Sequence, residues 1–238
     1  LLLVLSGCGP SPEPPAPASE AAQAGTEVTT AADRRPDSSE RPSRYTIEQF
    51  MDTERIAGAG FSADGRRIAY SSNRSGVFNV YAQPVDGGEP VQLTDSTTDP
   101  RFFQAWFPND DRLIFSGDQG GNELDHVYVR EADGTVVDLT PGEGLKANFV
   151  GFSSDGTRFW VASNERDNSV FDIYEYDAET LERELLVENT VDAFPSAASP
   201  DGRYVAFRKV RVRSDTDILL WDRQSGEIEP LVADEGEV

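Results

Sequence analysis

Short apolar runs recur along most of the chain, and polar positions alternate with the apolar ones within them. The clearest alternating run occurs four times, as FNVYAQPV, DHVYVREA, FDIYEYDA and TDILLWDR. A period of two places successive side chains on opposite faces of a β-strand. Turn-forming residues separate the runs, so the pattern predicts an all-β fold of short strands.

These runs belong to a repeat of about 46 residues. The segments FSADGRRIAY, FPNDDRLIFS, FSSDGTRFWV and ASPDGRYVAF align on a shared aspartate, at Asp64, Asp110, Asp155 and Asp201. Closing leucines keep the same spacing, at Leu93, Leu139, Leu185 and Leu231. Each repeat has room for four short antiparallel strands, and four strands per repeat of this length predict a β-propeller blade. A lone blade exposes its sheet faces, so blades are expected to stack.

We expect the propeller region to cover residues 57–238. Its four blades are predicted at about 57–95, 102–141, 147–188 and 193–232. The final segment, ADEGEV, looks like the approach to another blade. We therefore expect the ring to be incomplete and the propeller truncated in this sequence.

The shared aspartates are predicted to form tight turns rather than to bind calcium. Glycine follows Asp64, Asp155 and Asp201, and an Asp-Gly pair between apolar runs supplies both the positive φ and the side-chain acceptor that a tight turn needs. A calcium site needs several oxygens around one ion, whereas stacked blades separate these turns. Asp111 replaces the glycine in the second repeat, so that turn must differ.

A short helix is predicted over residues 45–56, before the first blade. Thr46 and Gln49 fit a capping box, and TIEQFMDTERI carries apolar residues at roughly helical spacing.

The N-terminal segment predicts a lipid anchor. Residues 1–8 read as the end of a secretory signal whose start is missing, and Leu5-Ser6-Gly7-Cys8 resembles the lipobox of bacterial lipoproteins, in which Cys8 is lipidated. An ordinary signal peptide or a cut membrane helix are the alternatives. Residues 9–44 contain seven prolines and seven alanines and predict a disordered tether. We expect the protein on the periplasmic side of the cell envelope, and Gly9 favours the outer membrane.

Charge and cysteine content narrow the function further. The formal net charge of −22 argues against nucleic acid or anionic lipid as a partner, so we expect contact with the membrane only through Cys8. Calcium or a cationic substrate stays open, and a solvated acidic surface is the simpler explanation. One cysteine, Cys8, and one histidine, His126, cannot form a disulfide or a Cys/His zinc site, and we expect no cofactor.

The stretch SGDQGGNELDHVY, residues 116–128, resembles an active-site loop in composition. Gly120 and Gly121, however, do not precede a helix and have no phosphate-loop lysine beside them. His126 falls within a predicted strand and the repeat places no serine or cysteine nucleophile beside it. We therefore predict that His126 is a strand residue and not a general base.

The same stretch carries a family resemblance. The first repeat is similar to the repeats of the Tol-system periplasmic propeller and of the prolyl oligopeptidase family of serine peptidases. The succession GDQGGNELDHVY and SNERDNSVFDIYEYDAETLE more specifically resembles the N-terminal propeller of bacterial members of the acylaminoacyl and dipeptidyl peptidase type. The resemblance covers about residues 45–232. Its motif residues are Asp118, Gly120, Gly121, Asn122, Glu123, Asn164, Arg166 and Asp167.

The resemblance implies a propeller that gates access of peptide substrates to a following α/β-hydrolase domain. That domain would carry a serine in a Gly-x-Ser-x-Gly motif, and no such motif occurs in this chain. Some dipeptidyl peptidases bind the substrate amine with propeller glutamates, but Glu123 and Glu165 form no adjacent pair and receive no such role. We assign no catalytic residue. The alternative is a non-catalytic Tol-type propeller that binds protein partners.

Overall fold

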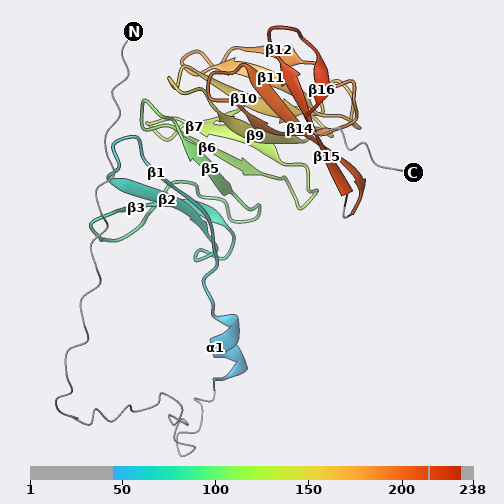
Figure 1. Cartoon of the computed structure of the whole chain (residues 1–238). Helices are drawn as coiled ribbons and strands as arrows, with labels where there is room; N and C mark the ends of the chain where they lie inside the picture. The colour runs from blue at the N-terminus through green and yellow to red at the C-terminus, as the bar shows by residue number, and fades with distance from the viewer. Residues whose placement is uncertain (1–44, 214, 232–238) are drawn as a thin grey trace, which may run out of the picture. The chain divides into compact units, whose positions relative to one another are not determined.

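The computed structural model describes residues 45–213 and 215–231, which form one short helix and four antiparallel sheets of four strands each (Figure 1). The all-β prediction, with four strands per repeat, is confirmed. We number the sheets as blades 1 to 4 in chain order.

Every blade is a meander in which the strands pair in the order of the sequence. Blade 1 contains β1 (Ile56–Phe61), β2 (Arg67–Ser72), β3 (Asn79–Pro84) and β4 (Val91–Gln92). Blade 2 contains β5 (Phe102–Trp106), β6 (Leu113–Gly117), β7 (His126–Arg130) and β8 (Val136–Asp138). Blade 3 contains β9 (Ala147–Phe152), β10 (Arg158–Ser163), β11 (Asp172–Asp177) and β12 (Arg183–Val187). Blade 4 contains β13 (Phe194–Ala198), β14 (Tyr204–Val212), β15 (Asp215–Asp222) and β16 (Ile228–Pro230).

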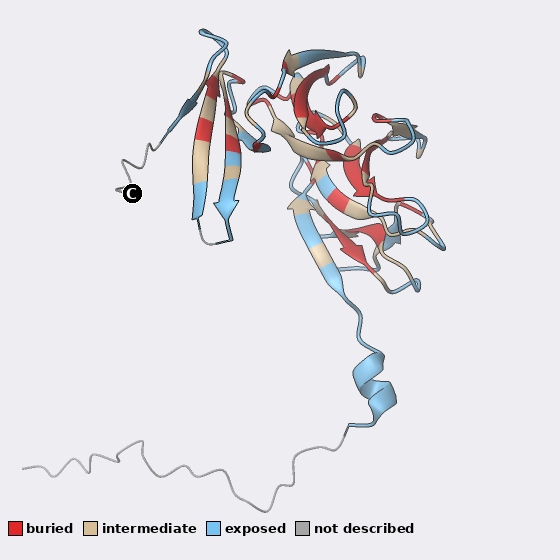
Figure 2. Cartoon of the chain, turned by 90° about the vertical axis from the view of Figure 1, so that its right-hand side faces the viewer, coloured by how far each residue is buried: buried red, intermediate tan, exposed pale blue. Residues whose placement is uncertain are grey.

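The hydrophobic core lies between the blades. One cluster joins Val80 of blade 1 to Phe103 and Leu113 of blade 2, a second joins blades 2 and 3, and a third joins blades 3 and 4. The buried residues follow the second and third strands of the blades (Figure 2). Since each cluster draws side chains from two neighbouring sheets, a blade gains its core by stacking, as the repeat predicts.

Three of the four turns between the first and second strands are nearly identical. Ser62, Ser153 and Ser199 each donate a hydrogen bond from Oγ to the repeat aspartate two residues later, at 2.6–2.7 Å. The glycine after each aspartate has a φ near +70°. These bonds confirm the predicted turn role of Asp64, Asp155 and Asp201.

The corresponding turn of blade 2 differs, as predicted from Asp111. Pro108 stands where the other blades have serine, so the hydroxyl donor is missing. Asp110 instead accepts bonds from the Arg112 guanidinium, at 2.7–3.1 Å, and from the Arg112 backbone N–H.

The helix is shorter than predicted. It covers Ile47–Met51 rather than residues 45–56. Arg55 already pairs with Asn73 through two backbone groups, because its N–H donates to Asn73 Oδ1 and its carbonyl accepts from the Asn73 N–H. The chain therefore adopts strand geometry there, and Ile56 begins β1 instead of ending the helix.

Candidate functional site

The two motif segments that carry the family resemblance form loops between the second and third strands of neighbouring blades. Residues 118–125 connect β6 to β7 and residues 164–171 connect β10 to β11. Lys146, just before β9, bridges the two loops. Its Nζ donates to the carbonyl of Glu123 at 2.8 Å and its backbone N–H donates to Asn164 Oδ1 at 2.7 Å. Motif residues more than forty positions apart are thus joined through one residue.

The glycines of the first loop make a tight reversal. Gly120, Gly121 and Glu123 all have positive φ values, of 66°, 71° and 60°. Glycine adopts this conformation without strain, whereas glutamate does so at some cost. The Glu123 backbone N–H donates to Asp118 Oδ2 at 3.0 Å, which closes the loop on its first residue. The glycines therefore allow the tight reversal of this loop.

Asp118 contains a buried oxygen without a hydrogen-bond partner. Its residue is only 7% exposed, and Oδ1 has no partner in the structure. The equivalent residues Asn73 and Asn164 each accept a backbone N–H from the residue that precedes the first strand of their blade. In blade 2 the register that pairs Phe102 with Ser116 places Pro100, two residues before β5, opposite Asp118, and proline has no N–H to donate. The orphaned oxygen therefore follows from a proline in the neighbouring segment.

Asp125 lies at the other end of the first loop and is half-buried. Burial raises the pKa of this carboxyl, Lys146 lowers it, and the nearby Asp118 raises it further. The net shift is upward. Two carboxyl groups therefore share this region with a single ammonium group.

His126 lies on a strand, as predicted, where it is the first residue of β7, and it is buried. Its Nδ1 lies 2.9 Å from Asp138 Oδ2 on β8, and its ring lies 6.1 Å from the ring of Tyr128. Asn79 and Asp172 hold the same strand position in blades 1 and 3, and both bond to the segment that follows the fourth strand. His126 therefore contacts the fourth strand of its blade, whereas Asn79 and Asp172 accept a backbone N–H from the segment after that strand.

The second loop is held by charged pairs. Arg166 donates from Nε and Nη2 to the carboxylate of Asp172, at 2.6 and 2.8 Å. Asp172 is fully buried and also accepts the Asn189 backbone N–H. Glu165 pairs with Arg183 at 2.9 Å. Asp167 accepts the Ser169 N–H, and this bond is the main cause of the lowered pKa of Asp167. The charged motif side chains of this loop are therefore used within blade 3.

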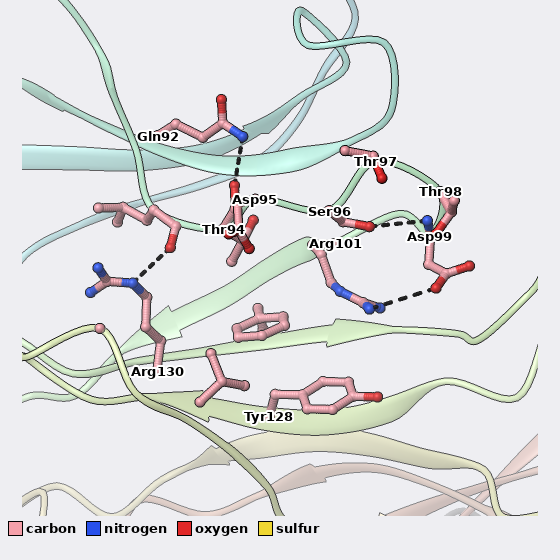
Figure 3. Close-up of a pocket in the computed structure, with 14 residues that line it drawn as sticks. Gln92, Thr94, Asp95, Ser96, Thr97, Thr98, Asp99, Arg101, Tyr128 and Arg130 are labelled. Carbon is pink, nitrogen blue, oxygen red and sulfur yellow. Dashed lines mark hydrogen bonds and ion pairs between the residues drawn. The ribbon is translucent and has the colours of Figure 1, made fainter.

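A pocket of about 650 Å³ lies beside the first loop, between blades 1 and 2 (Figure 3). One wall is the segment of residues 92–99 and the other is formed by Tyr128, Arg130 and their neighbours on blade 2. Arg101 lies over the Tyr128 ring, with Cζ 5.4 Å from the ring centroid, and donates to the carbonyl of Asp118 at 3.0 Å. The volume of the pocket is in the range of small-ligand sites.

The motif loop forms part of the surroundings of this pocket. Gly120 donates its N–H to Asp99 Oδ1 at 2.8 Å, and Gln119 Nε2 lies 3.5 Å from the Tyr128 hydroxyl. Burial is the main cause of the raised pKa of Tyr128. The pocket offers guanidinium, carboxylate and hydroxyl groups for binding. Its lining contains no histidine or cysteine, so the nucleophile–histidine pair of acyl-transfer enzymes is not assembled from these residues.

This pocket was not predictable from the repeat. Asp99 and Arg101 lie at the gap between the predicted blades 57–95 and 102–141, where the repeat gives no register. The polar run TDSTTDPR was the only available signal.

The described residues contain neither a metal-binding cluster nor a helix that could cross a membrane. Within them no group of three or more His, Cys, Asp or Glu side chains has metal-binding geometry. None of the helices in residues 45–213 and 215–231 has the length and hydropathy of a membrane span. Cys8, the predicted lipidation site, lies outside the described residues.

The chain is similar in sequence to parts of two longer proteins. No family model matches the chain. An uncharacterised protein of Agrobacterium fabrum is 30% identical over 117 residues, which cover 43% of this chain and 38% of that protein. Dipeptidyl peptidase family member 6 of Caenorhabditis elegans is 18% identical over 151 residues, which cover 60% of this chain and 20% of that protein. The chain thus spans well under half the length of either relative.

Solved structures of two kinds resemble the chain. TolB from Acinetobacter baumannii matches with a TM-score of 0.55 and 19% identity, over 75% of this chain and 44% of TolB. A structure of prolyl endopeptidases matches with a TM-score of 0.58 and 17% identity, over 77% of this chain and 30% of that one. A puromycin-hydrolyzing peptidase of Mycobacterium tuberculosis matches with a TM-score of 0.53 and 19% identity, over the same shares.

The fold is that of a β-propeller. Both kinds of protein carry this fold, and at these identities the likeness extends to the fold alone. The propeller structure is therefore compatible with a peptidase and with a TolB-type protein.

Proposed function

We propose that this chain is the substrate-gating propeller of an extracytoplasmic serine peptidase of the prolyl oligopeptidase family. The observation that carries the proposal is the junction at Lys146, where the loops of residues 118–125 and 164–171 meet. These two loops contain the motifs that resemble the peptidase propellers. Lys146 links the two loops at one end of neighbouring blades, and in this proposal the linked loops screen peptides by size.

The hydrolysis itself belongs to an α/β-hydrolase domain in this proposal. The described residues supply binding groups and a scaffold, and a serine, aspartate and histidine of that domain supply the chemistry. Peptides are the proposed substrates, and they reach the serine only after passing the propeller.

A serine-directed fluorophosphonate probe tests the peptidase assignment. The complete product of the gene and the 238-residue chain are labelled side by side. We expect covalent labelling of the complete product and none of the chain alone. Absence of labelling in the complete product, with an intact fold, would contradict the peptidase assignment.

Gating has a separate test in the complete protein. Lys146→Met removes the ammonium but keeps a stem of similar length, so the two loops lose their side-chain link. We expect kcat/KM for long peptides to rise relative to kcat/KM for dipeptide-length substrates. Glu179→Gln, an exposed change away from the loops, is the control. An unchanged ratio would exclude gating by these loops while leaving the peptidase assignment intact.

The second candidate is a non-catalytic propeller that binds protein partners in the cell envelope. The TolB likeness supports it, since the TM-score of 0.55 for TolB is comparable to the 0.58 of the prolyl endopeptidase match. In that case the complete product would stay unlabelled by the probe and would retain envelope proteins in a crosslinking pull-down.

We also propose a lipid anchor at Cys8 that holds the protein on the periplasmic side of a membrane. Support comes from the lipobox-like residues that end at Cys8. Cys8→Ala should move the protein from the membrane fraction to the periplasmic fraction. Retention of the variant in the membrane fraction would place the anchor elsewhere.

A further inference from the structure

The second and third strands of blade 4 are longer than those of the other blades. β14 and β15 have nine and eight residues, whereas the equivalent strands of blades 1 to 3 have five or six. In blades 1 to 3 the chain forms loops rich in Asn, Asp, Gly and Ser at this point. In blade 4 it reads KVRVR, and the valines favour strand structure. The two strands extend beyond the rest of the blade (Figures 1 and 2).

This extension has an open edge. β13 pairs with β14 only as far as Arg208, which lies opposite Phe194. Beyond Arg208, residues 209–212 pair with β15 on one side. No described strand covers their other side. We call residues 208–213 the arm. An open strand edge presents unpaired backbone groups to which another extended chain can bond.

The arm is the most basic segment of a very acidic protein. Four of its six residues are cationic, whereas the whole chain has a net charge of −22. Two of the four are fixed by the protein itself, since Lys209 Nζ donates to the Val191 carbonyl at 3.0 Å and Arg211 Nε pairs with Asp217 at 2.6 Å. Arg208 and Arg213 are exposed. The fixed pair holds the arm in place while the exposed pair faces solvent.

Apolar side chains interleave with these cations. Val210 and Val212 are 54% and 60% exposed. A segment that serves only to repel other edges needs charge and gains nothing from exposed valines. Charge together with apolar surface and an open edge is the composition of a peptide-binding edge.

We propose that the arm binds an extended, acidic segment of a protein partner, which adds to the open edge of β14. Its carboxylates pair with Arg208 and Arg213, and its apolar side chains cover Val210 and Val212. Opposite charge selects an acidic peptide over a basic one. The overall charge of −22 disfavours nucleic acid as the partner, because the density of negative charge along nucleic acid is far higher than along an acidic peptide. This inference goes beyond the proposed function and stands independently of it.

Fluorescence anisotropy with the full chain tests the proposal. The probe is a fluorescein-labelled octapeptide of alternating Glu with Thr or Val, and the comparison peptide has Lys at every Glu position. We expect the acidic peptide to bind, with an affinity that falls as salt increases, and the Lys peptide not to bind. The double variant Arg208→Glu, Arg213→Glu should weaken binding at least about tenfold.

Two controls keep the result specific. Arg66→Glu changes an exposed cation in the Asp-Gly turn of blade 1 and should leave the affinity unchanged. Hydrogen exchange should show new protection of the amides of residues 209–212 with the acidic peptide. Failure of the acidic peptide to bind, equal binding by the double variant, equal binding of the Lys peptide, or absence of this protection would each overturn the proposal. Circular dichroism confirms that the variants are folded.

Discussion

The two ends of the blades follow different rules. We call the end at which the first strand of a blade turns into the second the turn end, and the end at which the second strand connects to the third the loop end. At the turn end, three of the four turns contain the same serine–aspartate hydrogen bond and a glycine with the same positive φ. At the loop end, no two blades are alike: a short loop in blade 1, the glycine-rich loop of residues 118–125, the ion-paired loop of residues 164–171, and the arm of blade 4. The repeat thus constrains the turn end, while the loop end carries what is particular to this protein.

Strand β11 carries one buried acidic residue toward each end, and the two have different partners. Glu175, toward the turn end, accepts two bonds from Arg223 of blade 4, at 2.8 and 3.0 Å, and one from the Trp160 ring N–H at 2.9 Å. Burial by itself raises the pKa of Glu175, but the bonds from Arg223 and Trp160 outweigh it and the pKa is lowered. Asp172, toward the loop end, pairs with Arg166 of its own loop. One acid therefore joins two blades and the other orders one loop.

The largest predicted effect follows from breaking the inter-blade pair. Glu175→Ala removes the acceptor of five hydrogen bonds, two each from Arg158 and Arg223 and one from Trp160, and leaves the buried Trp160 N–H without a partner. We expect the free energy of unfolding to fall by about 3 kcal/mol, measured by urea denaturation. Glu179→Gln, an exposed glutamate close to it in sequence, should change the stability little. Equal losses of stability in the two variants would contradict the stabilising role of the bonds between Glu175 and Arg223.

A smaller and more local effect is expected at the loop end. Asp172→Asn keeps an acceptor for the Asn189 N–H but loses the charge that faces Arg166, which is 36% exposed. We expect a loss of about 1.5 kcal/mol and faster hydrogen exchange for residues 164–171. Exchange that accelerates equally across blade 4 would contradict a local role.

Asp118→Asn should act in the opposite direction. The orphaned carboxylate oxygen becomes part of a neutral amide, the residue type found at this position in blades 1 and 3. We expect stabilisation by roughly 0.5 to 1 kcal/mol in thermal and urea unfolding. Destabilisation would mean that the charge of Asp118 is needed, for instance by Arg101 nearby.

The turn end should contribute the smallest effect, and only through pH. The bond from Ser153 is the main reason that the pKa of Asp155 falls from 3.8 to about 2. A lowered folded-state pKa stabilises the protein above pH 3.8, and this contribution is lost as the pH falls through about 2. Asp155→Asn should therefore flatten the pH dependence of stability in this window, and Ser153→Ala should flatten it in part. An unchanged slope in both variants would refute the assignment.

The same contrast explains what the sequence could predict. The turns and strand order were predictable because Asp64, Asp155 and Asp201 act through neighbours two residues away. The position of His126 on a strand followed from the register of the repeat. The orphaned Asp118 oxygen was not predictable, because it depends on Pro100 across the sheet. The helix end was misplaced because the Arg55 pairing with Asn73 is likewise non-local.

Lys146 has a practical consequence for engineering. Its backbone N–H bonds to the loop of residues 164–171 and its ammonium group bonds to the loop of residues 118–125, so one residue links both loops. A chimera that takes residues 118–125 from another propeller would keep the hydrogen bond from the Lys146 backbone N–H to Asn164 Oδ1 but lose the Glu123 carbonyl that accepts from the ammonium group. Loop grafting in this protein should therefore exchange residues 118–125, 146 and 164–171 as one cassette.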